Sequence, residues 1–105
     1  MLLPTNPSND PADLAAQLAE ALVHLDDREA ALRFLSDLCT PAEVHTLAER
    51  WQVARLLDEN ELTYREIHEK TGVSTTTVVR VARFLRQEGN GGYRRLLDRM
   101  KERAK

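Results

Sequence analysis

The sequence has few aromatic residues, a single cysteine and no long hydrophobic run, and each scarcity excludes something. The one cysteine, Cys39, rules out an intramolecular disulfide. Only 5% of residues are aromatic while 42% are apolar, so a core must consist mainly of Leu, Val and Ala, which suits packed helices. No apolar segment approaches the roughly 20 residues that span a bilayer, and the first ten residues lack the features of a signal peptide. We therefore expect a cytoplasmic protein with no membrane partner.

Signatures of catalysis and of metal binding are missing as well. The histidines His24, His45 and His68 are isolated, with no metal-ligand spacing among them. No serine or cysteine nucleophile has a plausible base nearby. The Gly-x-Gly-Gly segment at 89–92 follows a helix instead of the strand that precedes a phosphate-binding loop. We expect neither an enzyme nor a metal or cofactor site.

Charge is divided unevenly along the chain. Residues 1–62 contain four arginines and twelve acidic residues, whereas residues 63–105 contain eleven basic and five acidic residues. The net charge of −2 therefore conceals an acidic N-terminal part and a basic C-terminal part. Because a basic surface attracts phosphates, this division favours nucleic-acid binding by the C-terminal part.

Helix-start signals and apolar periodicity predict six helices. No segment has the alternating pattern of a strand. Capping residues precede a helical apolar pattern at Asp10-Pro11, Asp26-x-x-Glu29, Thr40-Pro41-x-Glu43, Thr63-x-x-Glu66 and Ser74. The longest helix is predicted over 41–59, and its apolar stripe is too broad for one neighbouring helix to cover. In so small a chain, a second subunit is a natural source of the further cover.

The domain organisation predicted from these elements is simple. Residues 1–9 are expected to form a disordered arm, and residues 10–105 a single domain. Within that domain, the sequence predicts dimerisation helices over 10–60, a helix-turn-helix over 63–88 and a C-terminal helix over 91–103.

Residues 62–86 carry the pattern of a helix-turn-helix, a DNA-binding motif. Gly72 supplies the turn residue that tolerates positive φ, and Ile67 and Val78 lie where the two helices must meet. His68 stands where a small residue usually lets the helices pack closely. An ordinary helical hairpin is the alternative, and the basic charge of this part of the chain weighs against it.

The second helix of this motif begins with small hydroxyl residues and carries arginines on its open side. Its N-terminal residues are the ones that reach base edges in a major groove, where threonine can hydrogen-bond a base or touch a thymine methyl. Arginines further along are expected to contact phosphates, as are Arg94 and Arg95. The candidate DNA-binding residues are Arg65 on the first helix and Ser74, Thr75, Thr76, Val79, Arg80, Arg83 and Arg86 on the second.

From about Leu38 to Leu85 the sequence resembles the tryptophan repressor superfamily. The shared pattern is Leu-Cys-Thr-Pro-x-Glu from Leu38, Leu-x-x-Arg at 47–50, Leu-Leu near the end of the long helix, and Arg-Glu-Ile before Gly72. The Gly-x-Gly-Gly-Tyr-Arg segment at 89–94 makes the chain most similar to repressor-related bacterial proteins of the YerC/YecD type.

This resemblance implies an all-α fold of six helices and an intertwined homodimer. The N-terminal helices of both subunits would form one core, with two helix-turn-helix units outside it. The resemblance also implies base contacts at Arg65, His68, Thr75, Thr76 and Val79.

The superfamily's tryptophan site matches this chain only in part. The two arginines that enclose the indole match Arg50 and Arg80, and the threonine before the proline matches Thr40. A glycine that leaves room for the ligand is Val81 here, and a serine that helps to hold its amino group is Phe84. Thr40, Arg50 and Arg80 are therefore a possible ligand pocket, but the apolar bulk beside them predicts no response to tryptophan. Structural ion pairs are the alternative role of the two arginines.

Together these features predict a homodimeric transcriptional regulator, in function a repressor, that binds double-stranded DNA through residues 63–88 and blocks a promoter. Two alternatives stay open at this point. One is a protein-interaction module whose inherited helix-turn-helix binds an acidic partner through its basic face. The other is a repressor that responds to a different small ligand at the Arg50 and Arg80 site.

Overall fold

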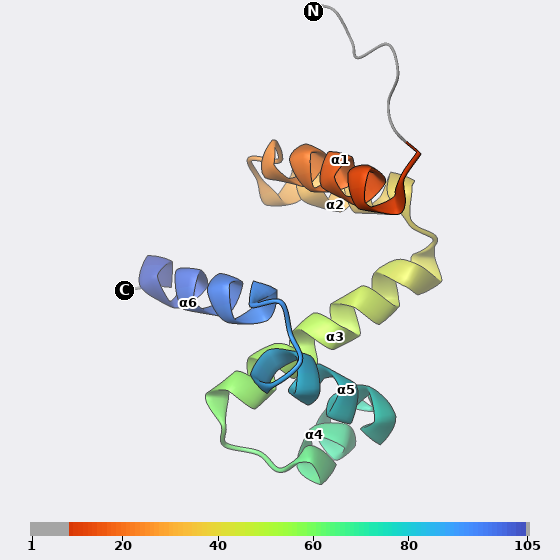
Figure 1. Cartoon of the computed structure of the whole chain (residues 1–105). Coiled ribbons are helices and arrows are strands. Elements are labelled where there is room, and N and C mark those ends of the chain that lie inside the picture. The colour runs from red at the N-terminus through yellow and green to blue at the C-terminus, as the bar shows by residue number, and fades with distance from the viewer. Residues whose placement is uncertain (1–8, 105) are drawn as a thin grey trace, which may run out of the picture. The chain divides into compact units, whose positions relative to one another are not determined.

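A computed structural model describes residues 9–104, which form six α-helices and, within this range, no strand (Figure 1). The helices are α1 (Pro11–Val23), α2 (Arg28–Leu38), α3 (Pro41–Glu59), α4 (Tyr64–Thr71), α5 (Thr75–Arg86) and α6 (Gly92–Ala104). The predicted all-α class with six helices is confirmed. The arm predicted over residues 1–9 lies, apart from Asn9, outside the described residues. None of the described helices is long and apolar enough to cross a membrane.

Side-chain caps explain where the first helices begin. The carboxylate of Asp10 accepts a hydrogen bond from a first-turn N–H at 2.9 Å, and Pro11 takes the first helical position, as predicted. The predicted start of α2 is wrong by one residue, because Asp27 and not Asp26 is the cap. Asp27 has the extended backbone, with φ of −148°, from which its carboxylate accepts from the Ala30 N–H at 2.7 Å.

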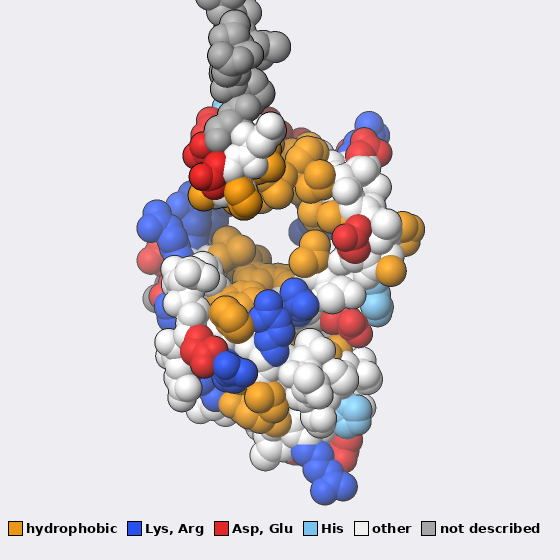
Figure 2. Space-filling model, turned by 45° about the vertical axis from the view of Figure 1, so that its right-hand side comes forward, with side chains coloured by type: hydrophobic (Ala, Val, Ile, Leu, Met, Phe, Trp, Pro, Cys, Tyr) orange, Lys and Arg blue, Asp and Glu red, His pale blue; other side chains and the backbone are white. Residues whose placement is uncertain are grey.

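The chain divides into two compact units, residues 1–40 and residues 41–105. The first unit contains α1 and α2, in which no residue is buried. Its leucines stay open to solvent, with Leu14 49%, Leu18 40% and Leu22 43% exposed, and hydrophobic side chains of this unit are visible at the surface in Figure 2. An apolar helix face left open in this way lacks the partner that would cover it. That residues 10–105 form one domain stays a prediction.

The hydrophobic core of the second unit is built from α3, α4, α5 and the turn between α4 and α5. Its buried side chains are Val53, Ala54, Leu57, Ile67, Val73, Val78, Val81 and Ala82. The buried residues of α5, Val78, Val81 and Ala82, recur with helical spacing, so one face of this helix is turned inward. Trp51 and Tyr93 pack against this core with their rings stacked, 6.4 Å between centroids. The core therefore holds the start of α5 on a rigid support.

One carboxylate near the end of α3 ties α6 to this core. Asp58, whose side chain is only 9% exposed, lies 2.7 Å from Arg94 Nη2 and 2.7 Å from Lys101 Nζ. The two cations lie two turns apart on one face of α6. The hydrogen bond from Lys101 lowers the pKa of Asp58 and that from Arg94 adds to the effect, while burial opposes both. Asp58 therefore keeps its charge between two partners that belong to another helix.

Candidate nucleic-acid interface

Both ends of α4 are closed by local hydrogen bonds, which fixes the direction in which α5 leaves it. At its start, the predicted capping box is present: the Thr63 N–H donates to the Glu66 carboxylate at 2.9 Å and lowers the pKa of that carboxyl. At its end, Gly72 has φ of 77°, the predicted left-handed conformation. Ser74 then caps α5 by accepting from the Thr77 N–H at 3.2 Å, as predicted.

The position expected to need a small residue holds His68, and the histidine adds a hydrogen bond to the turn. Its Nδ1 lies 2.7 Å from the backbone oxygen of Val73. Because a carbonyl oxygen can only accept, Nδ1 carries a proton and donates it. Val73 is only 2% exposed, so this bond satisfies a backbone oxygen in a buried turn. His68 is therefore part of the structure of the turn as well as a predicted base contact.

The start of α5 is exposed, as it must be in a helix that enters a groove. A shallow depression of about 340 Å³ on this side is lined by Thr75, Thr76, Val79, Arg80 and Arg83. Val79 is 43% exposed, whereas the adjacent Val78 is fully buried. The open side thus presents hydroxyl groups, one small apolar side chain and two guanidinium groups. These are the groups that contact base edges and phosphates in DNA complexes.

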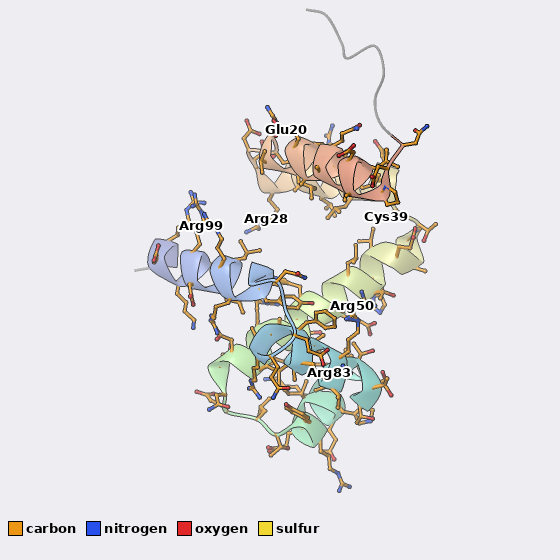
Figure 3. The ribbon with its side chains drawn as sticks, in the orientation of Figure 1. Glu20, Arg28, Cys39, Arg50, Arg83 and Arg99 are labelled. Carbon is orange, nitrogen blue, oxygen red and sulfur yellow. The ribbon has the colours of Figure 1, made fainter. Side chains whose placement is uncertain are left out.

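Two of the predicted DNA-binding arginines are already paired with acidic residues. Arg65 Nε lies 3.2 Å from the carboxylate of Glu69, and Arg83 donates to both carboxylate oxygens of Glu88, at 2.8 and 2.7 Å. Figure 3 places Arg83 on α5. Exposed ion pairs of this kind contribute little to stability. A phosphate can therefore take the place of either carboxylate at small energetic cost.

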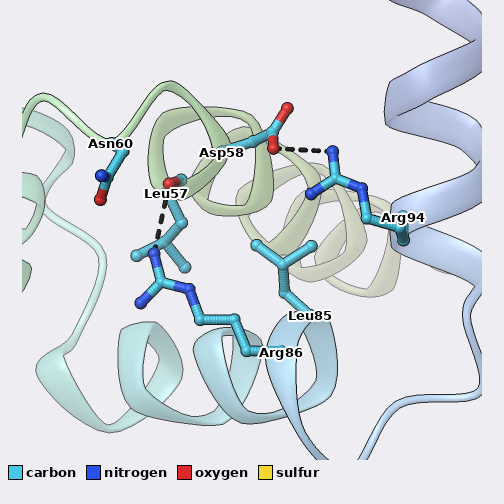
Figure 4. Close-up of a pocket in the computed structure, with 6 residues that line it drawn as sticks. All are labelled: Leu57, Asp58, Asn60, Leu85, Arg86 and Arg94. Atoms are coloured by element: carbon cyan, nitrogen blue, oxygen red, sulfur yellow. Dashed lines mark hydrogen bonds and ion pairs between the residues drawn. The ribbon is translucent and has the colours of Figure 1, made fainter.

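Arg86 contacts other helices of its own unit. Its guanidinium donates to the backbone oxygen of Leu57 on α3 at 3.4 Å (Figure 4). It also donates to the hydroxyl of Tyr64 on α4 at 3.3 Å. It lines a pocket of about 310 Å³ together with Leu57, Asp58, Asn60, Leu85 and Arg94. These contacts join α5 to the two helices that support it.

The residues matched to a ligand pocket have different surroundings. Thr40 ends the first unit, whereas Arg50 and Arg80 belong to the second. Arg50 Nε is enclosed without a hydrogen-bond partner among the described residues. Arg80 stacks over Phe84, 4.5 Å from the ring centroid, and Val81 is 1% exposed within the core.

Residues 9–104 contain no group of three or more His, Cys, Asp or Glu side chains that could hold a metal ion.

Sequence analysis missed the tie between α3 and α6 and assigned Arg94 to phosphate contact. In the structure Arg94 is held between Asp58, at 2.7 Å, and Asp98, at 2.9 Å. The available signal was the spacing of Arg94 and Lys101, which places two cations on the same face of α6. That spacing indicates an acidic partner on another helix, but it does not identify which one.

Known proteins are similar to this chain over most of its length. The sequence profile of the Trp repressor protein family matches residues 14–101. The uncharacterized protein YerC of Bacillus subtilis (strain 168) is 46% identical over 86 residues, which cover 82% of this chain and 81% of YerC.

Two solved structures share the fold as well. A TrpR like protein from Eubacterium eligens ATCC 27750 superimposes with a TM-score of 0.76 at 42% identity, covering 84% of this chain and 89% of that protein. A candidate Trp repressor from Staphylococcus aureus gives a TM-score of 0.76 at 40% identity, covering 84% of this chain and 86% of the other.

Proposed function

This chain belongs to the Trp repressor family, and from that membership we propose that it is a DNA-binding transcriptional regulator, in function a repressor, that acts as a homodimer. The observation that supports DNA binding best is the exposed start of α5. There Thr75, Thr76 and Val79 line the open side of a helix whose direction is fixed by a capped turn and a packed core.

In this proposal α5 enters the major groove with its N-terminal end. Thr75, Thr76 and Val79 contact base edges, and the first two can donate to a base while all three can touch a thymine methyl. Arg65 and His68 approach from α4. Ser74, Arg80 and Arg83 hold phosphates, with Arg83 exchanging Glu88 for a phosphate oxygen. Arg86 contributes by holding α5 on α3 and α4.

The homodimer is supported by the apolar surface that one chain leaves open. The helices of the first unit bury no residue, and in the first half of α3 Leu47 is 46% exposed. A second copy would cover such surfaces. A two-fold dimer carries two copies of α5, which suits a two-fold-related pair of DNA half-sites. A dimer bound there blocks a promoter by occupying it.

The assigned DNA surface is tested by a matched pair of double variants in a fluorescence-anisotropy titration of duplex promoter DNA. Arg65→Ala with Arg80→Glu changes the proposed interface. Arg28→Ala with Arg33→Glu makes the same charge change on the first unit. We expect the first variant to weaken binding at least a hundredfold, because it removes two cations and adds an anion facing DNA. The second should stay within a few-fold of the unchanged protein.

Equal losses in the two variants would contradict the assigned surface, since they would reflect net charge alone. Sedimentation of both variants checks that the dimer persists. A protein that binds no duplex DNA at all, yet forms a stable complex with an acidic protein, would instead be an interaction module with an inherited helix-turn-helix.

We further propose that tryptophan is not the effector. Val81 fills core space and Phe84 lies under Arg80, so the room that an indole would need is occupied. Isothermal titration with tryptophan should give no binding heat, whereas micromolar binding would overturn this proposal. Among the described residues the enclosed Arg50 Nε has no acceptor, and this observation favours a different ligand. Stabilisation of the protein in a thermal screen of small anions would support that alternative.

A further inference from the structure

The two ring nitrogens of His68 have different roles, and the turn between α4 and α5 assigns them. Nδ1 donates to the backbone oxygen of Val73 at 2.7 Å. A neutral imidazole carries a proton on one nitrogen and a lone pair on the other. The bond at Nδ1 therefore leaves Nε2 without a proton, as a hydrogen-bond acceptor that cannot donate.

The Nε2 atom of His68 is open to a partner from outside the chain. His68 is half-buried, and the bond to Val73 is the one hydrogen bond, ion pair or ring contact that it makes among the described residues. In that part of the chain, the side-chain polar atom that is enclosed without a hydrogen bond is Arg50 Nε. Nε2 of His68 is not enclosed in this way, and a solvent molecule or a ligand can therefore reach it.

The position of His68 places this acceptor in the proposed DNA interface. Helices α4 and α5 pack against each other (Figure 1), and Val73 directly precedes Ser74, the cap of α5. Arg65 lies three residues before His68 on the same side of α4, and its side chain is 86% exposed. The imidazole therefore lies at the start of α5, the part of that helix proposed to contact bases.

DNA offers few groups that can bind such an acceptor. The oxygens of its phosphates and deoxyriboses only accept, so a neutral Nε2 gains no hydrogen bond from the DNA backbone. In the major groove the donors are the exocyclic amino groups, N6 of adenine and N4 of cytosine. The exocyclic oxygens of guanine and thymine are acceptors, and an acceptor placed against them loses its water without gaining a bond. The open nitrogen of His68 therefore favours adenine or cytosine.

No other residue of the proposed interface has this character. The arginines of the interface only donate, its hydroxyl groups can both donate and accept, and its valine does neither. A hydroxyl group can therefore bind either an amino group or a carbonyl oxygen of a base. An acceptor without a proton binds only the amino group, which makes His68 the more selective contact.

We propose that His68 determines specificity at one base pair of each half-site, where its Nε2 accepts a hydrogen bond from the exocyclic amino group of adenine or cytosine. This inference rests on the DNA binding proposed above and adds the chemical group that is recognised. Each base pair presents one such amino group in the major groove, on its adenine or on its cytosine. The preference therefore concerns the strand, with adenine or cytosine on the strand that faces His68 and thymine or guanine opposite.

Two amide variants separate this role of His68 from its bond to Val73. In His68→Asn the amide nitrogen takes the place of Nδ1 and can donate to Val73, but no atom takes the place of Nε2. In His68→Gln the longer side chain carries its amide to the place of Nε2, where the oxygen can accept, but Val73 is left without a donor. His45→Asn is the control, because it makes the first of these changes at a side chain of α3 that is 75% exposed.

Binding is measured by fluorescence anisotropy at pH 8, where an imidazole is ordinarily neutral. The probes are the duplex that the unchanged protein enriches from a random library and duplexes with each other base pair at each position. At one position of each half-site, the unchanged protein and His45→Asn should bind about tenfold more weakly when guanine or thymine replaces adenine or cytosine.

Removal of the amino group itself should have a similar effect. Purine in place of adenine, or 2-pyrimidinone in place of cytosine, should weaken binding of the unchanged protein about tenfold. This comparison leaves the protein unaltered, so it does not depend on the folding of a variant. His68→Asn should be insensitive to the base and to the analogue while keeping the stability of the unchanged protein in urea. His68→Gln should lose stability and retain the preference for adenine or cytosine.

The other outcomes overturn the inference in distinguishable ways. A preference for guanine or thymine at the position that responds to His68 would show that Nε2 donates. Equal sensitivity of the unchanged protein and His68→Asn to the analogue would assign the amino group to another residue. Equal weakening of all duplexes by His68→Asn would assign the imidazole to the DNA backbone. An unchanged protein that enriches no sequence removes the proposed DNA binding itself.

Discussion

His68 adds a side-chain hydrogen bond to the turn between α4 and α5. Its Nδ1 donates to the backbone oxygen of Val73. Val73 lies between the two helices whose relative direction would set how α5 meets DNA in the proposed complex. Gly72 gives this turn its left-handed residue, but a glycine adds no side-chain bond of its own. The histidine therefore replaces the close packing of a small residue with a specific hydrogen bond.

Replacing this histidine should destabilise the protein measurably. In His68→Ala the carbonyl of Val73 loses its partner in a buried turn, which we expect to lower the free energy of unfolding by about 1–2 kcal/mol. Urea denaturation followed by circular dichroism measures this. His45→Ala is the control, because the His45 side chain is 75% exposed and its contact is with Glu49 at 3.4 Å. Equal effects in the two variants would show that the bond to Val73 contributes nothing.

Among the helices, α6 depends most on a single side chain. Asp58 near the end of α3 accepts from Arg94 and from Lys101, and these two contacts hold α6 against α3. Asp58→Asn removes the charge while keeping the shape. We expect a loss of about 1–3 kcal/mol in the free energy of unfolding near neutral pH, because two charge-assisted hydrogen bonds are weakened together.

This contribution should depend on pH in a defined direction. The pKa of Asp58 is lowered in the folded chain from its ordinary value of 3.8, chiefly by the hydrogen bond from Lys101. A lowered folded pKa means that the stabilisation is fully present above about pH 4 and is lost as pH falls through the folded value. Denaturation at pH 7 and at pH 3 should show the gap between Asp58→Asn and the unchanged protein narrowing in acid. Asp98→Asn, with a side chain 56% exposed, should show only a small gap, and a gap for Asp58→Asn that stays constant would contradict this account.

The positions of the helices were largely predictable because their caps are local. The bounds of α3 and the capping box at Thr63 follow from neighbouring residues alone. The start of α2 was misplaced because Asp26 and Asp27 both offer a carboxylate, and only the backbone angles distinguish them. The exposed start of α5 was predictable for the same reason, since the Ser74 cap fixes where the helix begins.

The contacts between helices could not be predicted in the same way. Arg86 reaches Leu57, and Asp58 reaches Arg94, across long separations in sequence. Such contacts depend on how the helices cross, which no local pattern encodes. The local pair of Arg83 and Glu88 was also missed, because its spacing of five residues differs from the three or four residues that bring side chains together on a helix.

As a whole, the chain combines a well-packed second unit with a first unit that cannot cover its own leucines. The second unit holds the proposed DNA-contacting helix, and the first supplies acidic and apolar surface. Under the proposed function, assembly with a second copy and recognition of DNA would be linked, because only a dimer would set the distance between two copies of α5. A monomer would contact a single half-site and lose most of its affinity and specificity.

Selection of bound sequences from a random duplex library, with the purified full chain, tests the central claim most directly. The account predicts enrichment of an inverted repeat whose half-sites are about 10 base pairs apart, centre to centre, or a multiple of that spacing, because a two-fold dimer places its α5 helices in successive major grooves. Recovery of no enriched sequence, or of a single half-site without a symmetric partner, would contradict it.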